Sequence, residues 1–523
     1  MPSQLIRILS LVTVLLVLPV SRAWAATVES NSVSGDVLLL DNLGRVVVVP
    51  TNEVPSGLGP PSDMNLNRQI PEPTPGSIMS DEVLQRTREG EAGFQLFPAV
   101  PPVLMPYLAS QDEFGNTVTR PGALIPFAPS EPLVQGGKYW LSERGFRYSL
   151  EQTFTCVTMT DVKGSNMLNT LEFYTFDLKS KWAIFGAPDA GTAGWISSQI
   201  DAKIGFNPDA EKQSPKSNLG TVTEPAGIWS GVNGVRVPEL AWQQSLRDGE
   251  IVVVAGMVNQ GNYIDQNAYA QSGRNQFFNS ALIDSMVLPL ASYNFGLNLQ
   301  WQPLPEWYAM LGGNVGHAPA GFSPWTDFNE NDWSLVGEIG YAPKDFLGLG
   351  PGIYRIQPFL ARVTGLAQTS YTVTIPGTTN STDVTVNSTT NSRVQAGLCF
   401  DFQQQLGSKS PFGWFGRFGF GGSEVSAGAA AQVGTGFVMQ GPFKHLLFQR
   451  TSNDILGVGF VWSQPSATTE SVYHQNEYIL ETKYALQLTP TIKIQPDMQV
   501  IWDPAHNPNG RATVFQLQLA MSW

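Results

Sequence analysis

The sequence predicts an all-β protein, a transmembrane antiparallel up-and-down β-barrel of about 16 strands with a Pro-rich N-terminal periplasmic segment. Three observations support this fold class. The C-terminal stretch alternates like a barrel strand, the N-terminus reads as a secretory signal, and the composition is rich in glycine and aromatic residues but poor in charge. Together they indicate a chain that is exported and then crosses a membrane by strands.

The C-terminal stretch from Arg511 to Trp523 alternates between apolar residues and small or polar ones. Because successive side chains of a strand point to opposite faces, one face carries only apolar residues: Phe515, Leu517, Leu519, Met521 and Trp523. A half-buried soluble strand shows a similar alternation, but a barrel strand has a reason to end on an aromatic ring at the membrane interface. We expect this strand to close the barrel and to be recognised by the barrel-assembly machinery.

The first 25 residues read as a signal peptide. Arg7 precedes an apolar run from Ile8 to Val20, and Ala23-Trp24-Ala25 places small residues at the two positions that a signal peptidase reads. A membrane-anchoring helix is the weaker interpretation, because the run is shorter than the roughly 20 residues that a bilayer-spanning helix needs. The expected location is the outer membrane of a Gram-negative-type bacterium.

Composition favours strands and argues against one class of partner. Of 523 residues, 51 are glycine, 11% are aromatic and 14% are charged, and the mean hydropathy of -0.07 is typical of alternating lipid-facing and lumen-facing residues. The formal net charge of -13 speaks against nucleic acid, since phosphate binding needs clustered Lys and Arg. Cys156 and Cys399 both read as membrane-facing, so we interpret them as small apolar residues, with a disulfide as the alternative.

Residues 26–138 form a distinct Pro-rich segment. Prolines recur from Pro50 to Pro132, and proline at this density does not sit inside a hydrogen-bonded sheet. Within this segment, Asp36–Leu40 and Arg45–Val49 predict a small hairpin. We interpret the segment as a periplasmic extension or partial plug, with a plain linker as the alternative.

Residues 139–523 are predicted to form the barrel domain, and its alternating pattern begins after Gly145. In Phe146–Cys156 the apolar residues occupy even positions and the polar residues odd ones, and the same alternation recurs at 195–206, 477–488 and 492–500. A charge facing lipid near the bilayer midplane costs roughly 2 to 4 kcal/mol, so the polar sets are expected to face a wet lumen. A soluble sandwich shows a similar local pattern, but the persistence of the alternation to the end of the chain favours a barrel.

The connections also fit an asymmetric barrel. The connection at 489–491 is very short, as on the periplasmic side, whereas 207–232 and 372–393 are long and polar, as on the outer side. With roughly 23 residues for each strand and its share of loop, the segment from Gly145 predicts about 16 strands and an aqueous channel.

Several stretches resemble the OprB family of carbohydrate-selective porins and occur in the order of that family. These stretches are Leu141–Gly145, Glu239–Gln244 with Asp248 and Gly249, Phe277–Ala281, Pro351–Arg355, Asp454–Gly459, and the closing run from Tyr484 through Gln499 to Pro504. The resemblance implies an outer-membrane barrel, surrounded by lipid, that passes mono- and small oligosaccharides by diffusion, and it allows a homotrimer. The Pro-rich segment departs from the family pattern, so the resemblance says nothing about the periplasmic mouth.

The candidate constriction residues lie mainly between Glu239 and Arg274. A sugar that crosses a narrow constriction loses part of its hydration shell, so the wall must offer donors and acceptors that hold it weakly. Paired Arg and carboxylate side chains do this for hydroxyls, and an aromatic ring stacks on a pyranose face. The candidates are Glu239, Trp242 and Gln243 at a strand entry, Asp265, Asn267 and Arg274 in a loop that forms the eyelet if it folds inward, and Arg147 and Glu151 on the first strand. For each residue, a solvated lumen or loop position is the alternative.

Enzymatic functions are poorly supported by the sequence. The histidines are scattered without a zinc motif, at His317, His445, His474 and His506, and no G-x-S-x-G elbow is present. We therefore expect no enzymatic activity, no metal and no cofactor, with an outer-membrane β-barrel hydrolase as a remote alternative. A general diffusion porin is the closer alternative, and equal permeation of sugars and amino acids of one size would favour it.

Overall fold

The structure is a computed structural model. For 37–40, 46–49, 366–374 and 381–389 it describes the backbone alone, and for most of 144–522 it describes backbone and side chains. The gaps in the latter range lie at 165–166, 186–192, 208–212, 230, 232, 248–249, 275, 291–292, 316–331, 364–365, 375–380, 390–392, 408–409, 423–427, 443–453, 467–474 and 490. The predicted signal peptide and nearly all of the Pro-rich segment lie outside the described residues.

The chain divides into two compact units, residues 1–65 and 66–523. In the first unit, β1 (Val37–Leu40) and β2 (Val46–Val49) pair antiparallel, so the hairpin predicted there is confirmed. The function of residues 26–138 as an extension, plug or linker stays a prediction.

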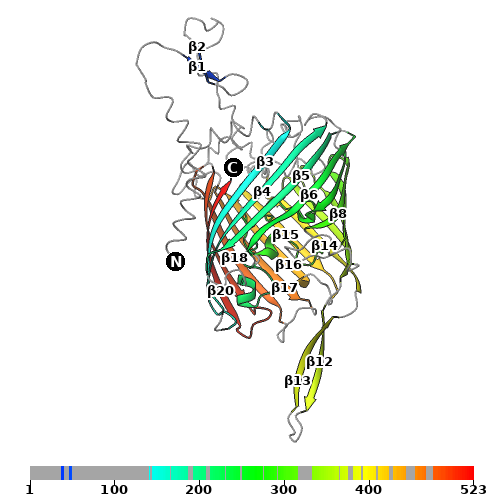
Figure 1. The fold of residues 1–523 in the computed structure, drawn as a ribbon, viewed down its shortest axis with the longest axis vertical. Helices are drawn as coiled ribbons and strands as arrows, with labels where there is room; N and C mark the ends of the chain where they lie inside the picture. The colour runs from blue at the N-terminus through cyan, green and yellow to red at the C-terminus, as the bar shows by residue number, and fades with distance from the viewer. Residues whose placement is uncertain are drawn as a thin grey trace, which may run out of the picture. The chain divides into compact units, whose positions relative to one another are not determined.

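The second unit contains a closed 16-strand antiparallel barrel, as the sequence predicted, with strands tilted side by side around its wall (Figure 1). Its strands are β3 (Phe146–Met159), β4 (Thr170–Phe185), β5 (Ala193–Gly205), β6 (Gly234–Leu246), β7 (Ile251–Val258), β8 (Asn294–Leu304), β9 (Trp307–Val315), β10 (Trp333–Tyr341), β11 (Gly352–Val363), β14 (Arg393–Gln405), β15 (Phe412–Phe420), β16 (Ala429–Gln440), β17 (Ile455–Pro465), β18 (Glu477–Gln487), β19 (Ile492–Trp502) and β20 (Arg511–Ser522). Between β11 and β14, β12 (Leu366–Thr374) and β13 (Ser381–Thr389) pair only with each other.

The last strand closes the barrel against the first. Each strand pairs with its neighbours in the chain order, and β20 then pairs antiparallel with β3, from Val514 opposite Met159 to Ser522 opposite Glu151. This pairing leaves no free sheet edge, which is the condition for strands to lie in hydrocarbon.

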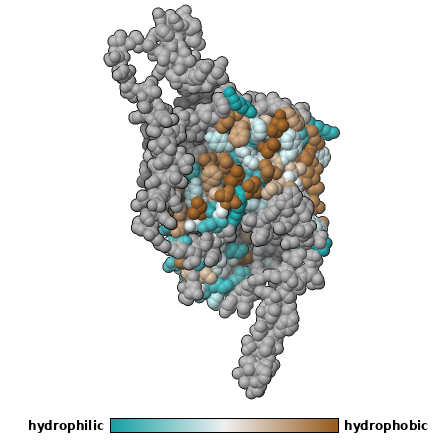
Figure 2. Space-filling view, in the orientation of Figure 1, coloured by the Kyte–Doolittle hydropathy of each residue, from teal (hydrophilic) through white to brown (hydrophobic). Residues whose placement is uncertain are grey.

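The two faces of the wall differ as the alternation predicted. In β20, Phe515 and Leu517 are 49% and 54% exposed, whereas Gln516 and Gln518 between and after them point inward and are 4% and 1% exposed. Apolar side chains gather over the visible outer wall in Figure 2. The exposed apolar residues on other strands include Leu240, Leu297, Trp301, Leu311, Ile339, Leu360, Phe400, Trp414, Phe437, Phe460 and Leu480.

The connections alternate in length, as an asymmetric barrel requires. Those at one end are mostly short, such as 247–250, 305–306, 406–411 and 488–491. Those at the other end include the long segments 206–233 and 259–293, whose described residues contain α5 (Pro215–Leu219), the 3-10 turn η5 (Gln260–Asn262) and α6 (Ser280–Ile283). Among the described residues, no helix is long and apolar enough to cross a bilayer.

The two cysteines face opposite surfaces of the wall, which corrects the interpretation of Cys399 as membrane-facing. Cys156 is exposed on the outer face of β3, whereas Cys399 is buried and its Sγ atom lies 3.5 Å from the Ser285 Oγ atom inside the barrel. Cys399 shares its face of β14 with Asp401 and Gln403, so the parity of the strand directs it inward. Both thiols are free.

Placing a charge on the outer face tests the orientation of the wall. We expect Leu517→Arg to lower the free energy of unfolding in lipid vesicles by about 2–4 kcal/mol, because the guanidinium then lies in hydrocarbon. The matched control Leu349→Arg places the same charge in the connection between β10 and β11 and should cost about 0–1 kcal/mol. Urea titration of both variants measures the difference, and equal costs would contradict the assignment of the outer face.

Candidate functional site

Residues 259–293 join β7 to β8, and we call them the internal loop. Its described residues, all but 275, 291 and 292, lie inside the barrel. Tyr263, Asp265 and Phe277 of this loop are at most 1% exposed. The loop bonds to inward-facing side chains of several strands on different sides of the wall, namely β6, β10, β14, β15, β16, β18, β19 and β20. The loop that the sequence singled out for the eyelet therefore crosses the lumen.

The start of the internal loop is held by Glu239, one of the predicted site residues. The Tyr263 hydroxyl donates to Glu239 Oε1 at 2.9 Å, and Asn262 Nδ2 donates to Glu239 Oε2 at 3.0 Å. Gln243 lies further along the same inward face of β6 and is fully buried. Both residues belong to the wall behind the loop.

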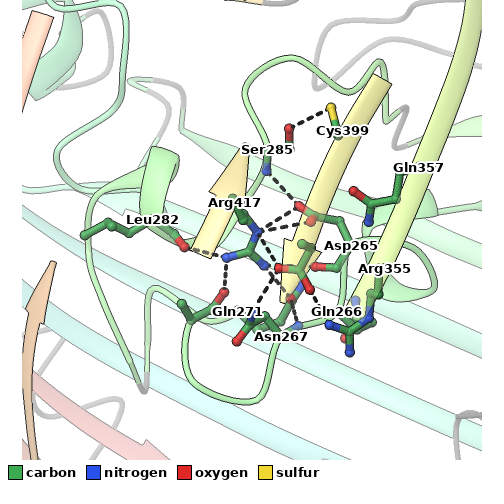
Figure 3. Close-up of polar contacts among 12 residues, drawn as sticks. Asp265, Gln266, Asn267, Gln271, Leu282, Ser285, Arg355, Gln357, Cys399 and Arg417 are labelled. Atoms are coloured by element: carbon green, nitrogen blue, oxygen red, sulfur yellow. Dashed lines mark hydrogen bonds and ion pairs between the residues drawn. The ribbon is translucent and has the colours of Figure 1, made fainter. Parts of the chain in front are cut away.

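Arg417 of β15 binds the middle of the internal loop through its guanidinium group (Figure 3). Its Nε atom donates to Asp265 Oδ1 at 3.0 Å, its Nη1 atom donates to the carbonyls of Ala270 and Leu282 at 2.6 Å each, and its Nη2 atom donates to the Asp265 carbonyl at 2.9 Å. A planar guanidinium with five N–H donors suits such a convergence of acceptors. Arg417 therefore ties together parts of the loop that are distant in sequence.

A second arginine extends this anchor to the neighbouring strands. Arg355 of β11 donates to Asp401 of β14 and, through Nε at 2.9 Å, to the hydroxyl of Tyr308 on β9. Asp401 Oδ2 in turn accepts from Asn267 Nδ2 of the loop at 2.8 Å. The predicted residues Asp265 and Asn267 are thus anchored in the wall and buried.

The environment of Asp265 shows how tightly the loop is held. Burial raises the pKa of the Asp265 carboxyl to about 6, although the guanidinium of Arg417 opposes this rise. Its backbone adopts a φ of 65°, in the left-handed region that Asp tolerates better than most residues. Its amide donates to Glu338 Oε2 at 3.0 Å, and its Oδ2 atom accepts from the Ser285 amide at 2.7 Å (Figure 3).

Arg274 connects the internal loop to the opposite wall. Its Nη1 atom lies 3.4 Å from Asp177 Oδ2 on β4, and its Nε atom lies 3.9 Å from Glu151 Oε2 on β3. Arg147 lies on the same inward face of β3 as Glu151 and is half-buried. The structure therefore brings Arg274, Glu151 and Asp177 together, and the sequence had singled out two of these three.

Trp242 is the predicted site residue that the structure leaves apart from the others. It points outward, is 36% exposed and packs against Phe185 with a ring-centroid distance of 5.7 Å. Adjacent strand residues face opposite sides, so Trp242 and Gln243 do not share a surface. Glu239 and Gln243 face inward, so the uninterrupted alternation between them directs Trp242 outward.

Residues that sequence reasoning missed carry most of the anchor. Arg355, Asp401 and Arg417 are nearly fully buried, and each lies among apolar, glycine and amide residues of its strand. Such a charge at an inward position is the signal that points to them, because a buried ion needs a partner. Among the described residues, no group of His, Cys, Asp and Glu side chains is arranged to hold a metal ion.

A closed barrel with an apolar outer belt and a charged loop across its lumen is the architecture of an outer-membrane porin. Comparison with known families narrows this class, because the profile of the carbohydrate-selective porin family, OprB, matches residues 204–522. The chain belongs to this family. Fold and family are those of a channel rather than an enzyme, and both point to the outer membrane of Gram-negative-type bacteria.

Individual relatives agree with this assignment. The chain is 22% identical to Porin AaxA of Chlamydia abortus over 351 residues, which cover 66% of this chain and 68% of that porin. It is 24% identical to Porin AaxA of Chlamydia caviae over 353 residues, covering 67% and 69%. The high-pH structure of Pseudomonas putida OprB covers 74% of this chain and 96% of its own with a TM-score of 0.58 at 15% identity, which shows a shared fold.

Removing the Arg417 guanidinium should release the internal loop. We expect Arg417→Met to lower the local free energy of opening of the loop by about 3–5 kcal/mol, because the buried Asp265 carboxylate loses its partner. Hydrogen exchange of the amides in 259–293 measures this change. Arg511→Met, at the exposed start of β20, is the matched control, and unchanged exchange in the Arg417 variant would refute the anchor.

Proposed function

We propose that this porin passes mono- and small oligosaccharides passively along a path between the internal loop and the wall formed by β3 and β4. Arg274, Glu151 and Arg147 are the side chains that we assign to this path. Glu239, Asp265 and Asn267 are assigned instead to holding the loop, Gln243 is assigned to the buried wall behind it, and Trp242 is left out because it points outward.

The observation that carries this proposal is a contrast in exposure between two groups of charges. The side chains of Arg274 and Glu151 are 15% and 28% exposed, whereas those of Arg355, Asp401, Arg417 and Asp265 are at most 2% exposed. A solute in the lumen contacts only groups that it can reach. The Arg274 side of the loop is therefore the side on which permeation is proposed.

The geometry of these charges suits weak binding of hydroxyl groups. Arg274 lies 3.4 Å from the Asp177 carboxylate and 3.9 Å from the Glu151 carboxylate, and both separations are longer than a charge-assisted hydrogen bond. A guanidinium donates to a sugar oxygen, and a carboxylate accepts from a sugar hydroxyl. Because the two groups have opposite charge, the pair does not favour a net charge on the solute, and release remains fast.

The same proposal covers location and assembly. The apolar belt contacts outer-membrane lipids after the signal peptide has been removed, and β20 presents the closing strand to the barrel-assembly machinery. Sucrose-gradient fractionation of membranes tests the location.

We further propose that the barrel assembles as a homotrimer. The mass of the detergent-solubilised protein tests this assembly, and a monomeric mass would overturn it.

Two other functions are distinguished by direct measurement. A general diffusion porin would pass sugars and amino acids of equal size at equal rates. An outer-membrane hydrolase would release product from ester or peptide substrates, and we propose that this chain has no such activity. Family membership and the reachable, oppositely charged pair favour sugar selectivity over both.

Liposome swelling with sugars and uncharged amino acid derivatives of matched size tests the proposed path. We expect the wild-type protein to favour the sugars. Arg274→Met should reduce this preference by up to about tenfold, since a hydrogen bond to a charged group contributes about 1.5 kcal/mol or more. Arg247→Met, in the exposed turn between β6 and β7, is the control and should leave the preference unchanged. A wild-type protein without preference would demote the chain to a general diffusion pore.

A further inference from the structure

The segment Phe277–Ala281 of the internal loop, which we call the docking segment, bonds to the wall and to a second loop that also enters the barrel. This second loop comprises residues 206–233, between β5 and β6, of which the structure describes 206–207, 213–229, 231 and 233. Permeation does not explain the docking segment, because Phe277 and Phe278 are 1% and 2% exposed and offer nothing to a solute.

The wall has a notch that receives the apolar part of the docking segment. Gly457 and Gly459 lie on the inward face of β17, and a Cβ atom on Gly457 would come within 2.8 Å of the Phe277 ring. A Cβ atom on Gly459 would come within 2.6 Å of Leu282, the residue that follows the segment. The missing side chains of β17 therefore make the space that the loop fills.

The adjacent strand, β18, binds the backbone of the docking segment. Glu481 is fully buried, and its two carboxylate oxygens accept from the amides of Phe278 and Asn279 at 2.6 Å and 2.9 Å. On the same face of β18, Lys483 Nζ lies 4.0 Å from the centroid of the Phe278 ring, in a cation–π contact. A buried carboxylate that accepts two amides fixes the backbone in one register.

A second glutamate on the same face of β18 binds the second loop in the same way. Glu477 is fully buried and accepts from the amide of Val222 at 3.1 Å and from the hydroxyl of Thr223 at 2.8 Å. It also accepts from the amide of Ala505, in the connection between β19 and β20, at 3.1 Å. One face of β18 therefore holds both loops, the internal loop through Glu481 and the second loop through Glu477.

The two loops also bond to each other. The Glu224 amide donates to Ser280 Oγ at 2.8 Å, and the Ser280 amide donates to the Glu224 carbonyl at 2.9 Å. The Gly227 amide donates to the Phe278 carbonyl at 2.7 Å. These bonds join the second loop to the docking segment, the same segment that Glu481 and the glycine notch hold.

We propose that the internal loop and the second loop form one cooperative unit docked on β17 and β18, and that Glu477 and Glu481 are positioning residues that set the size limit of the pore. This inference rests on the proposed function for its link to permeation. Its structural part is that loss of either glutamate loosens both loops, and this part does not depend on the proposed function. Neither glutamate contacts the solute, so both act through the loops.

Hydrogen exchange of the full-length protein in detergent tests the cooperative unit. Glu481→Ala should speed exchange of amides in 206–233 as well as in 259–293. Glu477→Ala should likewise speed exchange in both segments. The double variant should exchange little faster than either single variant. Effects confined to the loop that each glutamate touches would overturn the proposal. Glu306→Ala, in the turn between β8 and β9, is the control.

Size exclusion in liposomes tests the effect on permeation. We expect both alanine variants to raise the rate for a trisaccharide relative to a monosaccharide by several-fold, whereas Glu481→Gln, which keeps one acceptor, should have a smaller effect. Altered hydrogen exchange with an unchanged size limit would overturn the assignment of the glutamates to pore size. A wild-type protein that passes no sugar would overturn the proposed function, and the exchange experiment would still decide the cooperative unit.

A substitution in the notch tests the proposal even if the alanine variants misfold. Gly457→Leu leaves both glutamates in place but fills the space of the Phe277 ring, so it should reproduce the exchange and size-limit changes. Gly422→Leu is the matched control, because a Cβ atom there meets nothing within 4 Å. Heat-modifiable migration on gels confirms that each barrel is folded. Wild-type behaviour of the folded Gly457 variant would contradict the proposal.

Discussion

The fold depends on one constraint, that hydrocarbon offers no partner for a backbone amide or carbonyl. The pairing of β20 with β3 satisfies this constraint, because it converts a sheet with two open edges into a closed wall. Closure in turn fixes the side-chain parity of every strand, with one set against lipid and the other against the lumen. The positions of the charged residues inside the barrel follow from that parity.

The charged residues inside the barrel fall into two groups that differ in exposure. Buried charges cost several kcal/mol each unless they are paired, and Arg355, Arg417 and Glu481 are paired with the loops or with carboxylates. They hold the internal loop in place. The charges of Arg274 and Glu151 remain partly exposed on the other side of the loop. Because the internal loop is fixed to the wall on its anchored side, its position also determines the space between the loop and the wall at Arg274 and Glu151.

Much of the fold, but less of the site, could be predicted from the sequence. The alternation in β20 predicted both the closing strand and its lipid face, because period two is a local property. Trp242 and Cys399 were assigned to the wrong face, although alternation alone places them: Trp242 precedes the inward Gln243, and Cys399 lies two residues before the inward Asp401. Arg417 and Glu481 were missed because their partners lie far away in the sequence, in a loop whose path inside the barrel is a tertiary property.

The orientation of the two cysteines determines whether a disulfide can cross-link the barrel. Cys156 faces outward from β3, while Cys399 lies inside the barrel beside Ser285, so the wall itself separates the two sulfur atoms. No internal cross-link can form between them in the folded state. The described barrel is therefore held by noncovalent interactions alone, and thiol reductants should leave its integrity unchanged.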